Sequence, residues 1–152
     1  MHIIKPPLIQ SISDKKSIFL AGSIDNGDAV DWQTEVTKLL SDLDVYILNP
    51  RREEWDASWE QSADNPVFKE QVMWELTNLE KVDVILFNFL NNSQAPISLL
   101  ELGLCSRSAN VVVCCESDYW RRGNIEVVCE RYELTLVNSL DKAIPLIRKL
   151  LI

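Results

Sequence analysis

Short apolar runs rich in β-branched residues alternate along the chain with longer amphipathic stretches. Within each run the apolar residues follow one another without polar alternation, which is typical of strands buried on both faces of a parallel sheet. Five such runs predict strands at residues 17–20, 45–48, 82–89, 111–114 and 134–137. The stretches between and after them predict helices at residues 28–43, 65–80, 97–108, 124–132 and 139–150. The second helix has a clear start, because Asn65 is a good N-cap residue and Pro66 suits the first helical position.

Five strand–helix units with short connections imply right-handed crossovers between parallel strands. We therefore expect an α/β fold: a flavodoxin-like, doubly wound, five-stranded parallel sheet of order 2-1-3-4-5 between two helical layers, in a three-layer αβα arrangement. Ligands of such sheets bind beyond the carboxyl ends of the strands, so the loops that follow the strands are the places to look for a site. We expect a single domain over residues 17–152, preceded by an N-terminal arm of residues 1–16 that either packs on a partner subunit or is disordered.

The amino-acid composition limits the kinds of partner that the chain can bind. The chain has 152 residues, 47% of them apolar, and a formal net charge of −8. Such an acidic chain lacks the positive surface that nucleic acids and anionic membranes require, so we expect neither as a partner. No apolar run approaches the ~18 residues of a membrane span, and the first residues have no signal-peptide core, so we expect a cytoplasmic protein.

The single histidine and the spacing of the cysteines argue against several kinds of catalytic and metal site. His2 is the only histidine, so a Ser-His-Asp triad, a Cys-His pair and a His-based metal site are poorly supported, and we expect no metal. None of the four cysteines has a CxxC spacing, and we interpret them as small core residues in a reducing compartment. Catalysis in this chain must therefore rest on carboxylates.

Two glutamates in apolar settings are the candidate catalytic residues. Glu101 follows the third predicted strand, in the first turn or so of an otherwise apolar helix, and Glu75 lies upstream in a similar setting. Partial burial would push their pKa values apart, so that one is a nucleophile and the other delivers a proton, as glycosyl transfer with retention requires. The alternatives are a helix N-terminal Glu101 that complements the macrodipole and a structural Glu75.

The loops supply candidate substrate-binding residues. Gly22 lies in a small-residue turn after the first strand that lets a ligand approach the backbone, and Asp25 could accept a bond from a sugar hydroxyl or cap the turn. The long loop from Asn49 contains Trp55, which could stack on a planar ring or fill a surface cluster or a subunit interface. Asn124 precedes the fourth helix, where it could cap the helix or reach into a neighbouring subunit's site.

Taken together, several segments resemble the nucleoside 2-deoxyribosyltransferase family over residues 17–145. The resemblance rests on residues 18–24 (IFLAGSI), 49–52 (NPRR), 82–88 (VDVILFN), 96–103 (PISLLELG) and 119–124 (YWRRGN). It implies a flavodoxin-like fold, no cofactor, 2'-deoxynucleoside and free nucleobase as substrates, and a homo-oligomer (dimer, tetramer or hexamer) whose sites are shared between subunits.

The resemblance also implies roles for individual residues. Glu101 matches the family's nucleophile, and Glu75 matches an acidic residue that contacts the base and helps to protonate it. Asn124 resembles an asparagine that the adjacent subunit contributes to the sugar's 5'-hydroxyl. Ala95 departs from the family, since it replaces either a base-reading Asp or the phosphate-binding Ser of related monophosphate hydrolases.

These observations favour an enzyme of nucleotide salvage that exchanges the base of 2'-deoxynucleosides through a covalent glutamyl intermediate in a ping-pong reaction. One alternative is an N-glycoside hydrolase of deoxynucleosides or their 5'-monophosphates. Another is a non-catalytic nucleotide-binding module on the same fold.

Overall fold

The computed structural model describes residues 1–108 and 110–152. Its elements in chain order are β1 (His2–Ile4), β2 (Ser17–Gly22), the 3₁₀ turn η1 (Asp25–Gly27), α1 (Trp32–Leu39), β3 (Tyr46–Leu48), α2 (Pro66–Leu79), β4 (Val84–Phe89), α3 (Pro96–Cys105), β5 (Val111–Cys115), α4 (Arg122–Tyr132), β6 (Thr135–Val137) and α5 (Leu140–Leu151).

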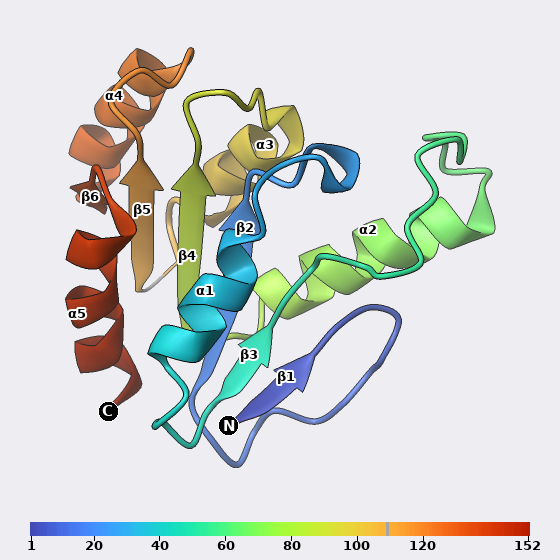
Figure 1. The fold of residues 1–152 in the computed structure, drawn as a ribbon, viewed down its shortest axis with the longest axis horizontal. Coiled ribbons are helices and arrows are strands. Elements are labelled where there is room, and N and C mark those ends of the chain that lie inside the picture. Colours follow the sequence, from blue (N-terminus) through green and yellow to red (C-terminus); the bar gives the residue numbers. More distant parts are fainter. Residues whose placement is uncertain (109) are drawn as a thin grey trace.

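The strands form one parallel sheet between two layers of helices (Figure 1). The strand order is β1-β3-β2-β4-β5-β6, and every neighbouring pair is parallel. Side chains of α1 and α5 pack on one face of the sheet, and those of α2, α3 and α4 pack on the other. The predicted three-layer α/β class is therefore confirmed.

The strand order corrects one detail of the prediction. The five predicted strands are β2 to β6, and they keep the order 2-1-3-4-5 among themselves, but a sixth strand, β1, pairs with the outer edge of β3. β1 has three residues, of which only Ile4 is buried, so its apolar pattern was too short to be recognised. It lies within the segment predicted to be an arm, and the packing of that segment on a partner subunit stays a prediction.

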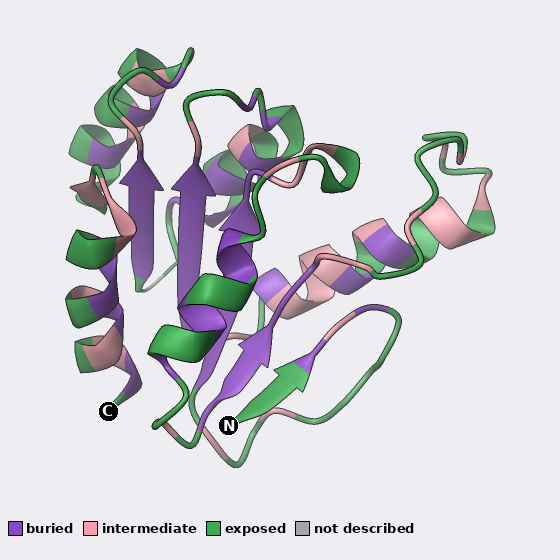
Figure 2. Ribbon diagram, in the orientation of Figure 1, coloured by how far each residue is buried: buried purple, intermediate pink, exposed green. Residues whose placement is uncertain are grey.

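The central strands are buried along their whole length (Figure 2). This explains the continuous apolar runs, since both faces of β2, β4 and β5 are covered by helices. The four cysteines are unbridged and buried, as predicted for core residues. Burial raises the pKa of the Cys105, Cys115 and Cys129 thiols to about 11 and that of Cys114 to about 12, which makes them poor nucleophiles.

The helix starts follow local capping chemistry. Asn65 caps α2 through its side-chain oxygen, which accepts a hydrogen bond from the Val67 amide at 3.2 Å, and Pro66 is the first helical residue, as predicted. α1 is shorter than the predicted helix 28–43 at both ends. It begins later because Asp31 caps it by accepting a bond from the Thr34 amide at 3.1 Å, and it ends at Leu39. The other predicted helices agree with the structure to within three residues at each end. In the described part of the chain no helix is both long and apolar enough to cross a membrane.

Candidate active site

Glu101 lies in the second turn of α3, on the side of the helix that faces the sheet. The buried residues of α3 recur once per helical turn, as a helix with one covered face requires: Ser98, then Glu101 and Leu102, then Cys105. The Glu101 residue is only 7% exposed. A position this far inside the helix weakens the alternative in which Glu101 merely complements the helix dipole, since that effect is confined to the first turn.

The start of α3 is attached to the carboxyl end of β2. The Ser98 hydroxyl donates a hydrogen bond to the Gly22 carbonyl at 2.8 Å. Ala95, immediately before α3, has a left-handed backbone with φ of 46°, which costs free energy for a residue with a β-carbon. This strained turn brings the Glu101 helix over the sheet edge where sequence analysis expected a ligand.

Glu75 lies on the neighbouring helix α2 and is oriented by Gln71, one helical turn earlier. The Gln71 amide nitrogen donates both to a carboxyl oxygen of Glu75 at 2.8 Å and to the Pro50 carbonyl at 3.1 Å. Because a carbonyl can only accept, this second bond fixes which end of the Gln71 amide faces Glu75. The bond from Gln71 leaves the other carboxyl oxygen of Glu75 free to carry a proton.

Both carboxyls have pKa values well above the ordinary glutamate value of 4.5. Burial raises the pKa of Glu75 to about 7, and the bond from Gln71 opposes part of that rise. Burial, together with the nearby negative charge of Glu75, raises the pKa of Glu101 to about 8. No positive charge among the described residues offsets either effect. Near neutral pH the pair therefore holds a proton, a condition that is typical of acid–base sites.

The loop after β2 brings two more candidates to the same edge of the sheet. Gly22 pairs with Asn88 of β4, and a β-carbon on Gly22 would lie 2.1 Å from the Asn88 carbonyl oxygen. Only glycine fits there, and its φ of 137° is also unfavourable for other residues. Asp25 accepts a hydrogen bond from the Ser93 hydroxyl at 2.9 Å, which joins this loop to the loop before α3.

Three other candidates have local partners of their own. Asn49 is buried, and its side-chain oxygen accepts a bond from the Arg51 amide at 3.0 Å, so it forms the turn after β3. Trp55 packs edge-to-face on Trp59 at 5.3 Å between ring centroids. Asn124 is exposed in the first turn of α4, where it lines a hollow of about 340 Å³ between α3 and α4. Substrate contact for these three residues stays a prediction.

Sequence reasoning missed Gln71, Ser98 and Arg51. Gln71 and Ser98 had a usable signal, since each lies one helical turn before a candidate glutamate, where side chains share a face. Arg51 had none, because its partners lie on a loop more than twenty residues earlier in the chain.

A separate hollow of about 650 Å³ lies at the carboxyl edge of the sheet, on the face covered by α1 and α5. Its lining includes Asn88, Glu116 and Asp141, and neither Glu75 nor Glu101 contributes to it. Among residues 1–108 and 110–152, no three His, Cys, Asp or Glu side chains converge in a way that could hold a metal ion.

Comparison with known proteins identifies the family of this α/β chain. The model of the family described as nucleoside 2-deoxyribosyltransferase-like matches residues 15–119, more than half of the chain. The chain belongs to this nucleoside 2-deoxyribosyltransferase-like family. The matched segment includes Gly22, Glu75 and Glu101 but ends before Asn124. No curated protein matches the chain.

Proposed function

We propose that the protein transfers the 2-deoxyribosyl group between nucleobases of 2'-deoxynucleosides, with Glu101 as nucleophile and Glu75 as proton donor. The observation that carries this proposal is the pair of carboxyls on α2 and α3, half-buried Glu75 and buried Glu101, which lack a neutralising cation among the described residues and have raised pKa values. Near neutral pH the pair shares one proton, and the reactive form is the one in which Glu101 is ionised and Glu75 holds that proton; because the pKa of Glu101 is the higher of the two, this form is a minority of the molecules.

In the first half-reaction, the Glu101 carboxylate attacks C1' of the deoxyribose. The bond between C1' and the base nitrogen breaks through an oxocarbenium-like transition state, and the departing base takes a proton from Glu75. The free base leaves, and the sugar stays on Glu101 as an ester. Because Gln71 occupies one oxygen of Glu75, the proton is delivered from the other oxygen.

In the second half-reaction, a nitrogen of the incoming base attacks C1' and the ester bond to Glu101 breaks. The proton displaced from that nitrogen returns to Glu75, so the enzyme is restored. Water at the same position would give free deoxyribose, which is the hydrolase outcome. The acceptor that reaches C1' first therefore decides between transfer and hydrolysis.

We infer that the donor is a neutral nucleoside rather than its 5'-monophosphate. Two nearby guanidinium groups are occupied: Arg51 donates to the Ala29 and Val30 carbonyls, and Arg122 donates to the Cys115 carbonyl. A third, that of Arg121, lies over the Trp120 ring, 4.4 Å from its centroid. Asp25 adds a negative charge at this edge of the sheet. A phosphate would have to displace these bonds and approach that charge.

We further propose a homo-oligomer with shared sites, working in the cytoplasm in nucleotide salvage. Four apolar side chains on α3 and α4 are 59–65% exposed: Ile97, Leu100, Leu104 and Val127. Such side chains favour an interface, and a partner subunit seated there would cover the hollow beside Asn124. In that arrangement Asn124 would contact the sugar bound to the neighbouring subunit.

The decisive experiment is chromatography of a reaction that contains 2'-deoxyinosine, free adenine and the protein. Formation of 2'-deoxyadenosine by the wild type and by a Glu80→Gln control, but not by Glu101→Gln, would support the proposal. Glu80 is an exposed glutamate at the end of α2, so it matches the chemical change outside the pair. Hypoxanthine release without a new nucleoside would indicate a hydrolase, and binding without turnover of purine or pyrimidine donors would indicate a binding module.

A further inference from the structure

We propose that Arg51 is a positioning residue that holds the β2–α1 loop, and with it Asp25, in place over the carboxyl edge of the sheet. This inference rests on the proposed function, because it gives Asp25 the task of binding the sugar of the nucleoside. Arg51 itself would not touch the substrate.

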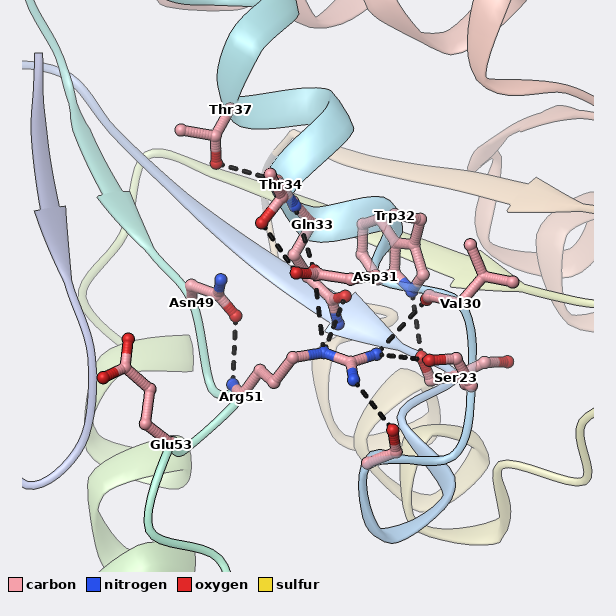
Figure 3. A network of polar contacts seen from close by, with 12 residues as sticks. Ser23, Val30, Asp31, Trp32, Gln33, Thr34, Thr37, Asn49, Arg51 and Glu53 are labelled. Atoms are coloured by element: carbon pink, nitrogen blue, oxygen red, sulfur yellow. Dashed lines mark hydrogen bonds and ion pairs between the residues drawn. The ribbon is translucent and has the colours of Figure 1, made fainter.

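The guanidinium of Arg51 reaches from the end of β3 into the loop before α1 (Figure 3). Its terminal nitrogens donate to three loop carbonyls: Gly27 at 3.2 Å, Ala29 at 3.0 Å and Val30 at 3.2 Å. Its Nε donates to the Gln33 side-chain oxygen at 3.3 Å, in the first turn of α1. All three guanidinium nitrogens are thus used to bind one short loop and the helix that follows it.

The loop needs such support because its backbone is unfavourable. Asp25 and Asn26 have φ values of 50° and 55°, in the left-handed region, and Gly27 has φ of 95°. Asp and Asn adopt this conformation more readily than other non-glycine residues, but as single residues, so two in succession need contacts that hold them. Without Arg51, the Gly27 and Ala29 carbonyls would lose their partner, while the Val30 carbonyl would keep its bond from the Trp32 amide at 2.9 Å. The strained turn would then have fewer contacts to maintain it.

Arginine is required by the geometry of these bonds. The Arg51 side chain is 16% exposed, and its planar fork presents donors in several fixed directions. Lysine has one ammonium on a flexible stem and could serve one or two of the carbonyls, but not all of them together with Gln33. We call the bonds from Arg51 to the three loop carbonyls and to Gln33 the clamp. An Arg51→Lys change keeps the positive charge and removes the clamp.

Arg51 is itself held at its base. Its amide donates to the Asn49 side chain at 3.0 Å, and the adjacent Pro50 carbonyl accepts from Gln71, the residue that orients Glu75. The turn of residues 49–51 is therefore bound both to the helix of the proposed proton donor and to the loop of Asp25. Ser93 completes the connection by donating to Asp25 from the loop that leads to α3.

The test compares Arg51→Lys with Arg148→Lys, a matched change at a half-buried arginine of α5 that binds Asp42 and the Leu39 carbonyl. Amide hydrogen exchange of residues 24–31 measures the clamp directly and needs no activity. Donor KM and kcat for base exchange measure its consequence. Gln33→Leu, which removes only the 3.3 Å bond, provides a milder variant if Arg51→Lys fails to fold.

We expect Arg51→Lys to speed exchange in residues 24–31 and to raise the KM for the deoxynucleoside about tenfold, equivalent to about 1.4 kcal/mol, while kcat stays within about threefold. Arg148→Lys should match the wild type, and Gln33→Leu should show a smaller effect in the same direction. Unchanged exchange and KM in Arg51→Lys would overturn the inference, as would a loss confined to kcat. A wild type that turns over no donor would refute the proposed function instead, and the exchange measurement would still test the clamp.

Discussion

Replacing Glu101 with glutamine should make the protein's stability less dependent on pH. The carboxyl has a pKa of about 8 in the folded protein and 4.5 as its ordinary value. Because the pKa is raised on folding, the stability it contributes is fully present below pH 4.5 and is lost as pH rises through 8. At about 1.4 kcal/mol for each tenfold change, the wild type should lose up to roughly 5 kcal/mol over this range from Glu101 alone.

The assay is urea denaturation of the wild type and Glu101→Gln at a series of pH values from 4.5 to 9. The free-energy cost of burying the glutamine amide is the same at every pH. It therefore does not affect how steeply the free energy of unfolding changes with pH, which is the quantity compared. We expect the free energy of unfolding of the variant to exceed that of the wild type increasingly as pH rises. The gain includes the repulsion between Glu101 and Glu75, because the substitution removes that repulsion together with the Glu101 charge.

Glu80→Gln is the control, since Glu80 is exposed on α2. Its pH dependence should match that of the wild type. Parallel curves for the wild type and Glu101→Gln between pH 5 and 9 would refute the reasoning, because they would show that Glu101 titrates near its ordinary pKa. A variant that is more stable at high pH but inactive would identify Glu101 as a residue kept for function at a cost in stability.

Three further outcomes follow from the structure. Turnover should peak between pH 7 and 8 and fall on both sides, since Glu101 is protonated at lower pH and Glu75 has lost its proton at higher pH; a flat profile from pH 5 to 9 would contradict this. Gly22→Ala should lower the free energy of unfolding by about 2–4 kcal/mol in urea titrations, because its β-carbon meets the Asn88 carbonyl; wild-type stability would contradict the close approach. Leu100→Glu should dissociate the oligomer in analytical ultracentrifugation, because it places a charge in an apolar interface; an unchanged mass would exclude this surface.

Much of the fold was readable from the sequence because the relevant signals are local. Continuous apolar runs marked the buried strands, and Asn65 with Pro66 marked the start of α2. Their alternation with helices led to the parallel sheet through general rules of chain connection. The start of α1 was misplaced, since nothing nearby in sequence showed that residues 25–27 form a separate turn and that Asp31 is the cap.

The candidate site also has features that the sequence indicated and features that only the tertiary structure showed. The amino-acid sequence by itself predicted that carboxylates carry the chemistry, since one histidine is available, and it singled out Glu75 and Glu101 as candidates. Only the tertiary structure decided how deeply these carboxyls are buried, that Gln71 orients Glu75, and that Arg51 clamps the loop of Asp25. Burial and contacts between loops depend on segments distant in the chain, so no local pattern records them, whereas strand and helix periodicity is written into neighbouring residues.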